Sequence, residues 1–229
     1  MTLSVDNFTF FQGEHQLFGP LSFTVSNGEV FTLMGPSGCG KSTLLNAIAG
    51  HLTTPFHFTG NVTLAEQAVL SLAPNERKIG LLFQDDLLFP HLTVRENLMF
   101  GLPKRYRGAE RQARANETLA ALSLSEQADK LPHALSGGQR ARISLMRMLL
   151  SEPQAVLLDE PFSKLDKTLR TAFRQFVFKQ IQARQIPAIM VTHDEDDVPA
   201  DGRVLHWPWP TSTNDAGSSH SHSQETPSC

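Results

Sequence analysis

The segment GPSGCGKS, residues 35–42, has the residue types and the spacing to hold a phosphate group. Glycines let the backbone turn its N–H groups toward phosphate oxygens, and a helix that follows points its positive end at them. Lys41 can reach the terminal phosphates, and the hydroxyl of Ser42 can ligate Mg²⁺. The pattern G-x-x-x-x-G-K-[ST] therefore predicts a site for a nucleoside triphosphate. The predicted phosphate-binding residues are Gly35, Pro36, Ser37, Gly38, Cys39, Gly40, Lys41, Ser42 and Thr43.

Cys39 lies inside this loop, and its role has two interpretations. The start of the following helix favours the thiolate, which would make Cys39 a reactive thiol. The simpler interpretation is that Cys39 is a small residue tolerated within the loop.

Polar residues also follow three apolar runs of strand length: Gln84 after KIGLLF, Asp159 and Glu160 after AVLL, and His193 after AIMVT. Buried parallel strands carry their chemistry at their carboxyl ends. We expect Asp159 to ligate Mg²⁺ and Glu160 to polarise the attacking water. Gln84 can contact both, and His193 can donate to the terminal phosphate. The predicted catalytic residues are Glu160, His193 and Gln84, and the predicted metal ligands are Ser42, Gln84 and Asp159.

The segment LSGGQ is a second candidate for anion binding. Ser136 and the glycines Gly137 and Gly138 stand directly before a segment with helical periodicity. A serine at a helix N-cap and bare glycine N–H groups present donors to an anion. With Gln139, these residues form a second predicted nucleotide-binding segment in a chain that already has a phosphate loop.

The elements that must position these residues alternate between strand and helix. GEVFTLMG predicts a strand entering the glycine loop, and KSTLLNAIAG predicts a helix ending at Gly50. Short runs broken by GP and NG predict strands over residues 3–30. Residues 87–150 are rich in Ala, Arg, Leu and Glu and predict helices. The expected fold class is α/β, with a helical lobe inserted into the core.

The composition narrows the class of protein. The chain has 229 residues, of which 40% are hydrophobic and 19% charged, as expected of a globular protein with a full core. Its net charge of −3 gives no reason to expect nucleic acid as a partner. The two cysteines, Cys39 and Cys229, cannot form a disulfide framework, so we expect a reducing compartment.

The N-terminal sequence and the hydropathy pattern predict neither a secretory signal nor a membrane-spanning helix. The N-terminus MTLSVDNFTFFQGEH lacks the basic segment and apolar run of a secretory signal. No stretch approaches the roughly 20 apolar residues of a membrane helix, so a membrane role would depend on partners. Residues 208–229 are rich in Ser, Thr and Pro and predict a disordered polar tail. His220 and His222 in this tail either bind a metal weakly or are simply solvated.

Six motifs in chain order, GPSGCGKS, LLFQD, LSGGQ, AVLLDEP, SKLD and VTHD, resemble those of the ATP-binding-cassette (ABC) ATPases. LSGGQ is the signature of that family, and the resemblance covers roughly residues 3–206. It implies a P-loop NTPase core with an N-terminal antiparallel β region, and ATP and Mg²⁺ as cofactors. It also implies one ATPase domain over residues 1–207, with the helical lobe at about 87–150 and the tail at 208–229.

The resemblance also explains the two anion-binding segments. In this family two ATPase domains pack head to tail, and each ATP lies between one subunit's phosphate loop and the other's signature. Ser136, Gly137, Gly138 and Gln139 would then bind the nucleotide of a second copy or a paired ATPase subunit. Asp166 of SKLD would line the interface.

An aromatic residue near the N-terminus stacks on adenine in this family. Phe11 in FTFFQGEHQLF matches that position best, although the spacing is shifted by one residue and Phe10 and Phe18 lie nearby. The other interpretation is that Phe11 is a core aromatic of a strand.

The stretch QDDLLFPHLTVRENLMFGL resembles ATPase subunits of bacterial solute importers, in particular the compact ATPases of thiamine- and iron-type importers. It implies an integral-membrane permease that docks at Leu87–His91, and a periplasmic or extracellular solute-binding protein as an indirect partner. The protein would lie peripherally on the cytoplasmic face of the bacterial inner (plasma) membrane. The apolar run from Leu87 to Pro90 suits a docking surface, or alternatively a core segment of the helical lobe.

Two other classes stay open. An exporter ATPase would share every nucleotide motif, but the LFPHLTV stretch argues against it. A non-transport ABC ATPase fits less well, because chromosome-maintenance members insert long coiled coils between loop and signature. The segment between Lys41 and Leu135 has no heptad pattern of the kind that forms a coiled coil.

Overall fold

The computed structural model describes residues 1–52 and 55–209. Its strands are β1 Leu3–Gln12, β2 His15–Val25, β3 Val30–Met34, β4 Phe56–Leu64, β5 Gln67–Ala68, β6 Ile79–Leu82, β7 Ala155–Asp159, β8 Ala188–Thr192 and β9 Val204–His206. Its α-helices are α1 Lys41–Ala49, α2 Val94–Gly101, α3 Gly108–Ala121, α4 Gly137–Leu149 and α5 Lys167–Arg184.

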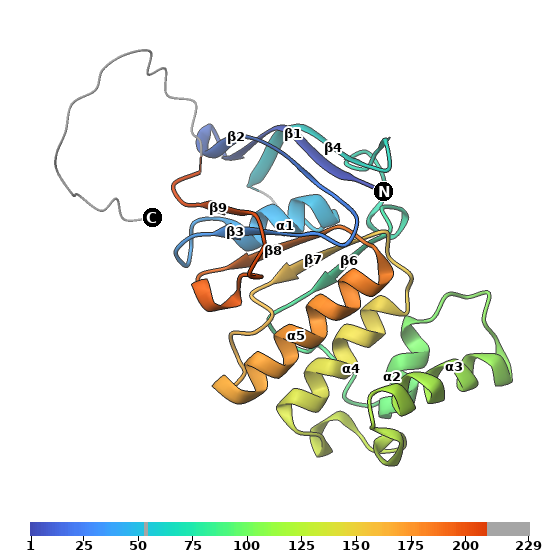
Figure 1. Cartoon of the computed structure of the whole chain (residues 1–229). Helices are drawn as coiled ribbons and strands as arrows, with labels where there is room; N and C mark the ends of the chain where they lie inside the picture. The colour runs from blue at the N-terminus through green and yellow to red at the C-terminus, as the bar shows by residue number, and fades with distance from the viewer. Residues whose placement is uncertain (53–54, 210–229) are drawn as a thin grey trace, which may run out of the picture.

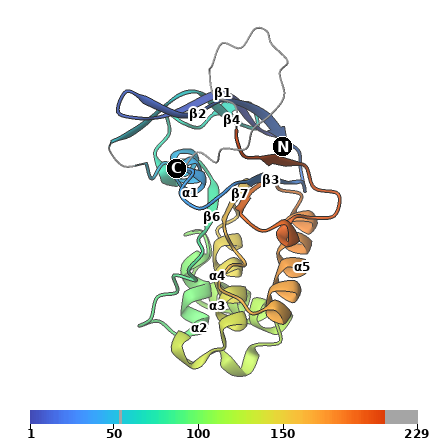
Figure 2. The same cartoon turned by 90° about the vertical axis from the view of Figure 1, so that its left-hand side faces the viewer.

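The strands form two sheets. One is antiparallel with the order β2-β1-β4-β5, and the other is parallel with the order β6-β7-β8-β3-β9. Figure 1 shows α1 between the sheets, α4 and α5 on the other face of the parallel sheet, and α2 and α3 beyond them; Figure 2 shows the same layers from the side. The predicted α/β fold, with an N-terminal antiparallel β region and helices inserted between β6 and β7, is confirmed.

The central parallel strands are apolar along their length because both faces are covered. Along β7, Ala155 and Leu157 pack in the core cluster that contains α1, whereas Val156 and Leu158 pack in the cluster that contains α4 and α5. All five residues of β8 are buried. Since β6, β7 and β8 run parallel as neighbours, their carboxyl ends meet at one edge of the sheet.

The C-terminal strand β9 pairs in parallel with β3, and the chain then continues into the core. Trp209 is only 1% exposed, so Pro208 and Trp209 belong to the folded part and not to the tail predicted from residue 208. Periodicity cannot reveal such an isolated buried aromatic. The rest of the predicted tail, with His220 and His222, lies outside the described residues. Over residues 1–52 and 55–209, no helix has both the length and the apolar character to cross a bilayer.

Candidate nucleotide site

The phosphate loop joins β3 to α1, as the sequence predicts. Gly38 and Gly40 have φ angles of +88° and +95°, a conformation that favours glycine, and Gly40 is the N-cap of α1. Residues 37–43 other than Cys39 line an open pocket, so the backbone at the start of α1 faces solvent. A helix N-terminus exposed in this way can bind an anion. Cys39 is instead buried, at 5% exposure, in the way of a small packed residue.

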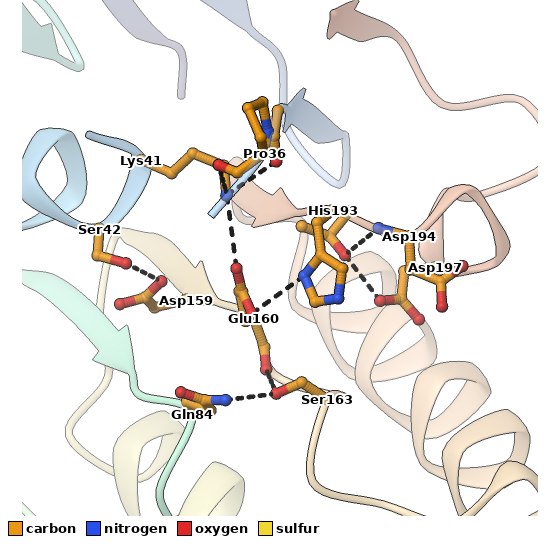
Figure 3. Close-up of polar contacts among 12 residues, drawn as sticks. Pro36, Lys41, Ser42, Gln84, Asp159, Glu160, Ser163, His193, Asp194 and Asp197 are labelled. Carbon is orange, nitrogen blue, oxygen red and sulfur yellow. Dashed lines mark hydrogen bonds and ion pairs between the residues drawn. The ribbon is translucent and has the colours of Figure 1, made fainter. Parts of the chain in front are cut away.

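Lys41 is the buried cation of the site, at 4% exposure. Its Nζ donates hydrogen bonds to the carbonyl oxygens of Gly35, at 2.9 Å, and Pro36, at 2.8 Å. The same nitrogen lies 3.5 Å from Oε1 of Glu160 (Figure 3). The ammonium group is thus held in place by the carbonyls of the loop and can exchange them for phosphate oxygens.

Ser42 and Asp159 meet where the first turn of α1 faces the end of β7. The Ser42 hydroxyl donates a 2.7 Å hydrogen bond to Oδ1 of Asp159. Burial raises the pKa of Asp159, the charge of Glu160 raises it further, and the Ser42 hydrogen bond and Lys41 counteract this only in part. The structure therefore places a hydroxyl and a carboxylate side by side, the hard oxygen donors that Mg²⁺ prefers.

No group of three or more His, Cys, Asp and Glu side chains with metal-ligand geometry occurs in the described residues. Mg²⁺ keeps several waters and needs few protein ligands when substrate phosphates supply the others. Ser42 and Asp159, with Gln84 on the same pocket, form a donor set of that kind.

Glu160 and His193 follow neighbouring strands, β7 and β8, and contact each other. Nδ1 of His193 lies 3.2 Å from Oε2 of Glu160. The backbone of Glu160 has a φ angle of +43°, and its N–H donates to the carbonyl of Val191 at 3.0 Å. This strained backbone turns the carboxylate toward Lys41 and His193 (Figure 3).

Gln84 reaches the same cluster through a residue that we did not single out from the sequence. Its Nε2 donates to Oγ of Ser163 at 3.0 Å, and that hydroxyl donates to the carbonyl of Glu160 at 2.9 Å. Ser163 therefore links the segment after β6 to the segment after β7 (Figure 3). Its position in SKLD, directly after DEPF, was the signal available in the sequence.

The structure thus brings residues predicted for phosphate binding and residues predicted for catalysis to one pocket within a single chain. Gln84, Asp159 and Glu160 line the pocket together with the phosphate loop, and His193 reaches it through Glu160. Phe11 does not line this pocket. Its ring stacks on that of His57 at 4.9 Å, so its proposed contact with adenine stays a prediction.

The signature segment lies elsewhere. Ser136 is the N-cap of α4, and it forms a capping box with Gln139: the Gln139 N–H donates to Ser136 Oγ at 3.3 Å, and the Ser136 N–H donates to Gln139 Oε1 at 2.9 Å. None of residues 136–139 lines the phosphate-loop pocket. Asp166 similarly caps α5 by accepting from the N–H groups of Thr168 and Leu169.

An ion-pair cluster around the buried carboxylate of Asp197 holds the loop after His193, and no sequence pattern predicted it. Arg170 of α5 donates to both carboxylate oxygens of Asp197, at 2.8 and 2.7 Å, and lies 2.8 Å from Asp194. The Thr192 hydroxyl also donates to Asp197, whose side chain is 2% exposed. The acidic run DEDD was visible in the sequence, but its partner on α5 was not.

The predicted docking segment Leu87–His91 is exposed only in part. Leu87 is 52% exposed, whereas Leu88 is 8% exposed and packs in the core, which corrects its place in the predicted apolar patch. Phe100 of α2 is 63% exposed, and its ring lies 4.5 Å from that of Phe89. We therefore define the exposed apolar surface of this region by Leu87, Phe89 and Phe100.

Comparison with known proteins agrees with this geometry. The profile of the ABC transporter family matches residues 18–163. The uncharacterized ABC transporter ATP-binding protein YnjD of Escherichia coli is 47% identical over 203 residues, which cover 89% of this chain and 94% of YnjD. The Fe(3+) ions import ATP-binding protein FbpC of Haemophilus influenzae is 39% identical over 200 residues, covering 85% of this chain and 56% of FbpC. The spermidine/putrescine import ATP-binding protein PotA of Thermotoga maritima is 40% identical over 194 residues, covering 84% and 52%. The chain thus spans nearly all of YnjD but little more than half of the two import proteins.

Proposed function

The chain belongs to the ABC transporter family as an ATP-binding protein, and from this premise we propose that it hydrolyses ATP to drive a bacterial solute importer. One observation carries the hydrolytic role: the phosphate loop, Asp159, Glu160 and Gln84 share a single pocket. The names of FbpC and PotA, which are import proteins, support the direction of transport.

In this proposal the phosphate loop binds the triphosphate of ATP. The N–H groups at the start of α1 and the ammonium of Lys41 contact the phosphate oxygens. Ser42, Asp159 and Gln84 hold Mg²⁺, which when bound neutralises charge that develops on the phosphates. Lys41 Nζ, which donates to the carbonyl oxygens of Gly35 and Pro36 at 2.9 and 2.8 Å, exchanges these acceptors for phosphate oxygens when the triphosphate binds.

Glu160 orients and polarises the attacking water. Its carboxylate is close to Lys41, at 3.5 Å, and to His193, at 3.2 Å, so its position is fixed from two sides. His193, which lies beside the Glu160 carboxylate, donates to the terminal phosphate. Gln84 couples the nucleotide state of the site to the position of the segment after β6, because hydrogen bonds join it to Glu160 through Ser163.

A second ATPase subunit completes the site. The capped N-terminus of α4 is a donor surface that the phosphate-loop pocket of its own chain does not use. Residues Ser136–Gln139 of one subunit then bind the triphosphate held by the other, so two Mg-ATP join a homodimer or a paired ATPase subunit. Hydrolysis removes the contact that holds the two subunits together.

The permease docks on the apolar surface of Leu87, Phe89 and Phe100, of which Leu87 follows Gln84 closely in the chain. This links the state of the nucleotide site to the membrane partner, at the cytoplasmic face of the bacterial inner membrane. A solute-binding protein delivers the solute to the permease.

Two measurements test this function. Purified protein should release phosphate from Mg-ATP, and it should lose that activity in Lys41→Ala. An N-terminally tagged chain, captured from gently solubilised membranes, should bring down a multi-span permease identified by mass spectrometry. Release of phosphate with only ribosomal or DNA-associated proteins recovered would overturn the transport role and leave the ATPase standing.

A further inference from the structure

Two tryptophans at the end of the described chain pack behind the phosphate loop. The backbone N–H of Trp207 donates to the carbonyl of Met34 at 2.9 Å, and the indole Nε1 of Trp209 donates to the same oxygen at 3.2 Å. Met34 is the last residue of β3 and directly precedes Gly35, the first glycine of the loop. The peptide that enters the loop is therefore held by two donors from the C-terminal segment.

The aromatic rings also contact both ends of the loop. A Cβ added at Gly35 would lie 3.1 Å from Cβ of Trp207, and one added at Gly40 would lie 3.0 Å from Cε1 of Phe18. The Trp209 ring lies 5.1 Å from that of Phe18, at 88°, and 5.5 Å from that of Trp207, at 68°. Trp209 thus connects the groups that touch the first and last glycines of the loop.

We propose that Phe18, Trp207 and Trp209 form an aromatic support that positions the phosphate loop for nucleotide binding, with Trp209 as its central positioning residue. A loop that is already ordered loses less conformational freedom when it binds a ligand. The family profile ends at residue 163, so both tryptophans lie outside the matched segment. The inference rests on the proposed nucleotide site in this loop.

The support also predicts an optical signal. Lys41 donates to the carbonyls of Gly35 and Pro36, and Gly35 lies beside Trp207. When Lys41 turns to a triphosphate, these carbonyls lose their partner and the surroundings of the Trp207 ring change. The chain has two tryptophans, both in the support, so its tryptophan emission reports on this region alone.

Hydrogen exchange without nucleotide tests the support directly. Trp209→Phe keeps an aromatic ring and removes the indole N–H. Phe8→Leu is the matched control, because Phe8 is fully buried in the same core cluster but stacks on Phe58 and Phe10, so that the Phe10 ring lies between it and Phe18 of the support. We expect amides of residues 34–44 to exchange about three- to tenfold faster in Trp209→Phe, as for the loss of one hydrogen bond, and at the wild-type rate in Phe8→Leu. Equal rates in wild type and Trp209→Phe, or equal acceleration in both variants, would overturn the proposal.

Nucleotide binding gives the second readout. By calorimetry we expect Trp209→Phe to bind Mg-ATP about threefold more weakly than wild type or Phe8→Leu, with a raised KM and nearly unchanged kcat. In the wild type, which needs no substitution, saturating Mg-ATP should change the tryptophan emission. Unchanged emission at saturation overturns the support. Failure of the wild type to bind Mg-ATP in the calorimeter overturns the nucleotide site instead, while hydrogen exchange still decides on the support.

Discussion

The hydroxyl of Ser42 donates a 2.7 Å hydrogen bond to Oδ1 of Asp159 and so joins the first turn of α1 to the end of β7. The two residues are 117 positions apart in the sequence, yet they place two oxygen donors at one point of the nucleotide pocket. Burial raises the pKa of this aspartate, so its carboxylate is more easily protonated than an exposed one.

The raised pKa of Asp159 predicts an acid limit for metal-dependent activity. Mg²⁺ needs the deprotonated carboxylate, and a proton competes for it as the pH falls through the raised pKa. We expect the Mg²⁺ concentration for half-maximal ATPase activity to rise on acidification, starting at a higher pH than the usual aspartate pKa of about 3.9. A pH series of Mg²⁺ titrations measures this, and an activity that stays independent of pH down to acid denaturation would contradict it.

Asp159→Asn should have opposite effects on stability and on metal response. A carboxylate whose pKa is raised by folding stabilises the folded state only when protonated, and this contribution is lost as the pH rises through the folded pKa. At neutral pH without ligand, we therefore expect the variant to melt at a temperature equal to or above that of the wild type. Mg²⁺ should no longer increase the melting temperature in the presence of ATP. If Asp159→Asn without ligand melted at a lower temperature than the wild type, the charge of the Asp159 carboxylate would not be destabilising.

Glu160→Gln should bind ATP and barely hydrolyse it. The amide keeps the size of the side chain but cannot accept a proton from water, and loss of a general base costs about 10²–10⁴ in rate. Because the nucleotide persists, we expect a dimer with Mg-ATP and a monomer without nucleotide, measured by light scattering. A monomer at saturating Mg-ATP would show that the chain does not form the head-to-tail pair without its permease.

Two inactive variants should restore activity when mixed. Gly137→Asp puts a carboxylate where the partner's phosphates bind, and its Cβ has only Arg140 as a near neighbour, at 4.0 Å, so the fold should tolerate it. Lys41→Ala removes the cation of the phosphate loop. A head-to-tail heterodimer of the two retains one intact site, so an equimolar mixture should recover about a quarter of the wild-type ATPase rate if sites act independently. No recovery, with mixed dimers verified by mass, would place the signature on its own chain's nucleotide.

Asp197→Ala should destabilise the fold. The Asp197 side chain is 2% exposed and accepts hydrogen bonds from Arg170 and Thr192. The substitution leaves Arg170, whose side chain is 22% exposed, paired with Asp194 alone, and it removes the acceptor of the buried Thr192 hydroxyl, so we expect a loss of about 1–3 kcal/mol. Denaturant unfolding measures this, with Asp196→Ala, at an exposed neighbouring aspartate, as the control. Equal loss in both variants would contradict a special role for the Asp197 cluster.

Leu87→Asp should separate docking from catalysis. The Leu87 side chain is 52% exposed, so a charge there should leave the isolated ATPase rate unchanged. It should reduce the permease recovered by membrane capture, since an apolar contact is replaced by a charge. Leu131→Asp, at a leucine that is 36% exposed outside this surface, provides the control. Full permease recovery with Leu87→Asp would show that the permease docks on another surface of the protein.

The sequence by itself determined the local features of this protein. GPSGCGKS and LSGGQ indicate a phosphate loop and a capped helix because neighbouring residues alone set those backbone conformations. The apolar runs before Gln84, Asp159 and His193 predicted buried parallel strands, and the common edge of such strands explains why these residues meet.

Only the tertiary structure decided the pairings between distant segments. The joining of Arg170 to Asp197, of Trp209 to Met34, and of Phe11 to His57 depends on how strands and helices pack. Packing also turned Leu88 inward while leaving Phe100 exposed beside Phe89. Such contacts leave no pattern along the chain, because their geometry is set by the arrangement of whole elements around two cores and not by adjacent residues.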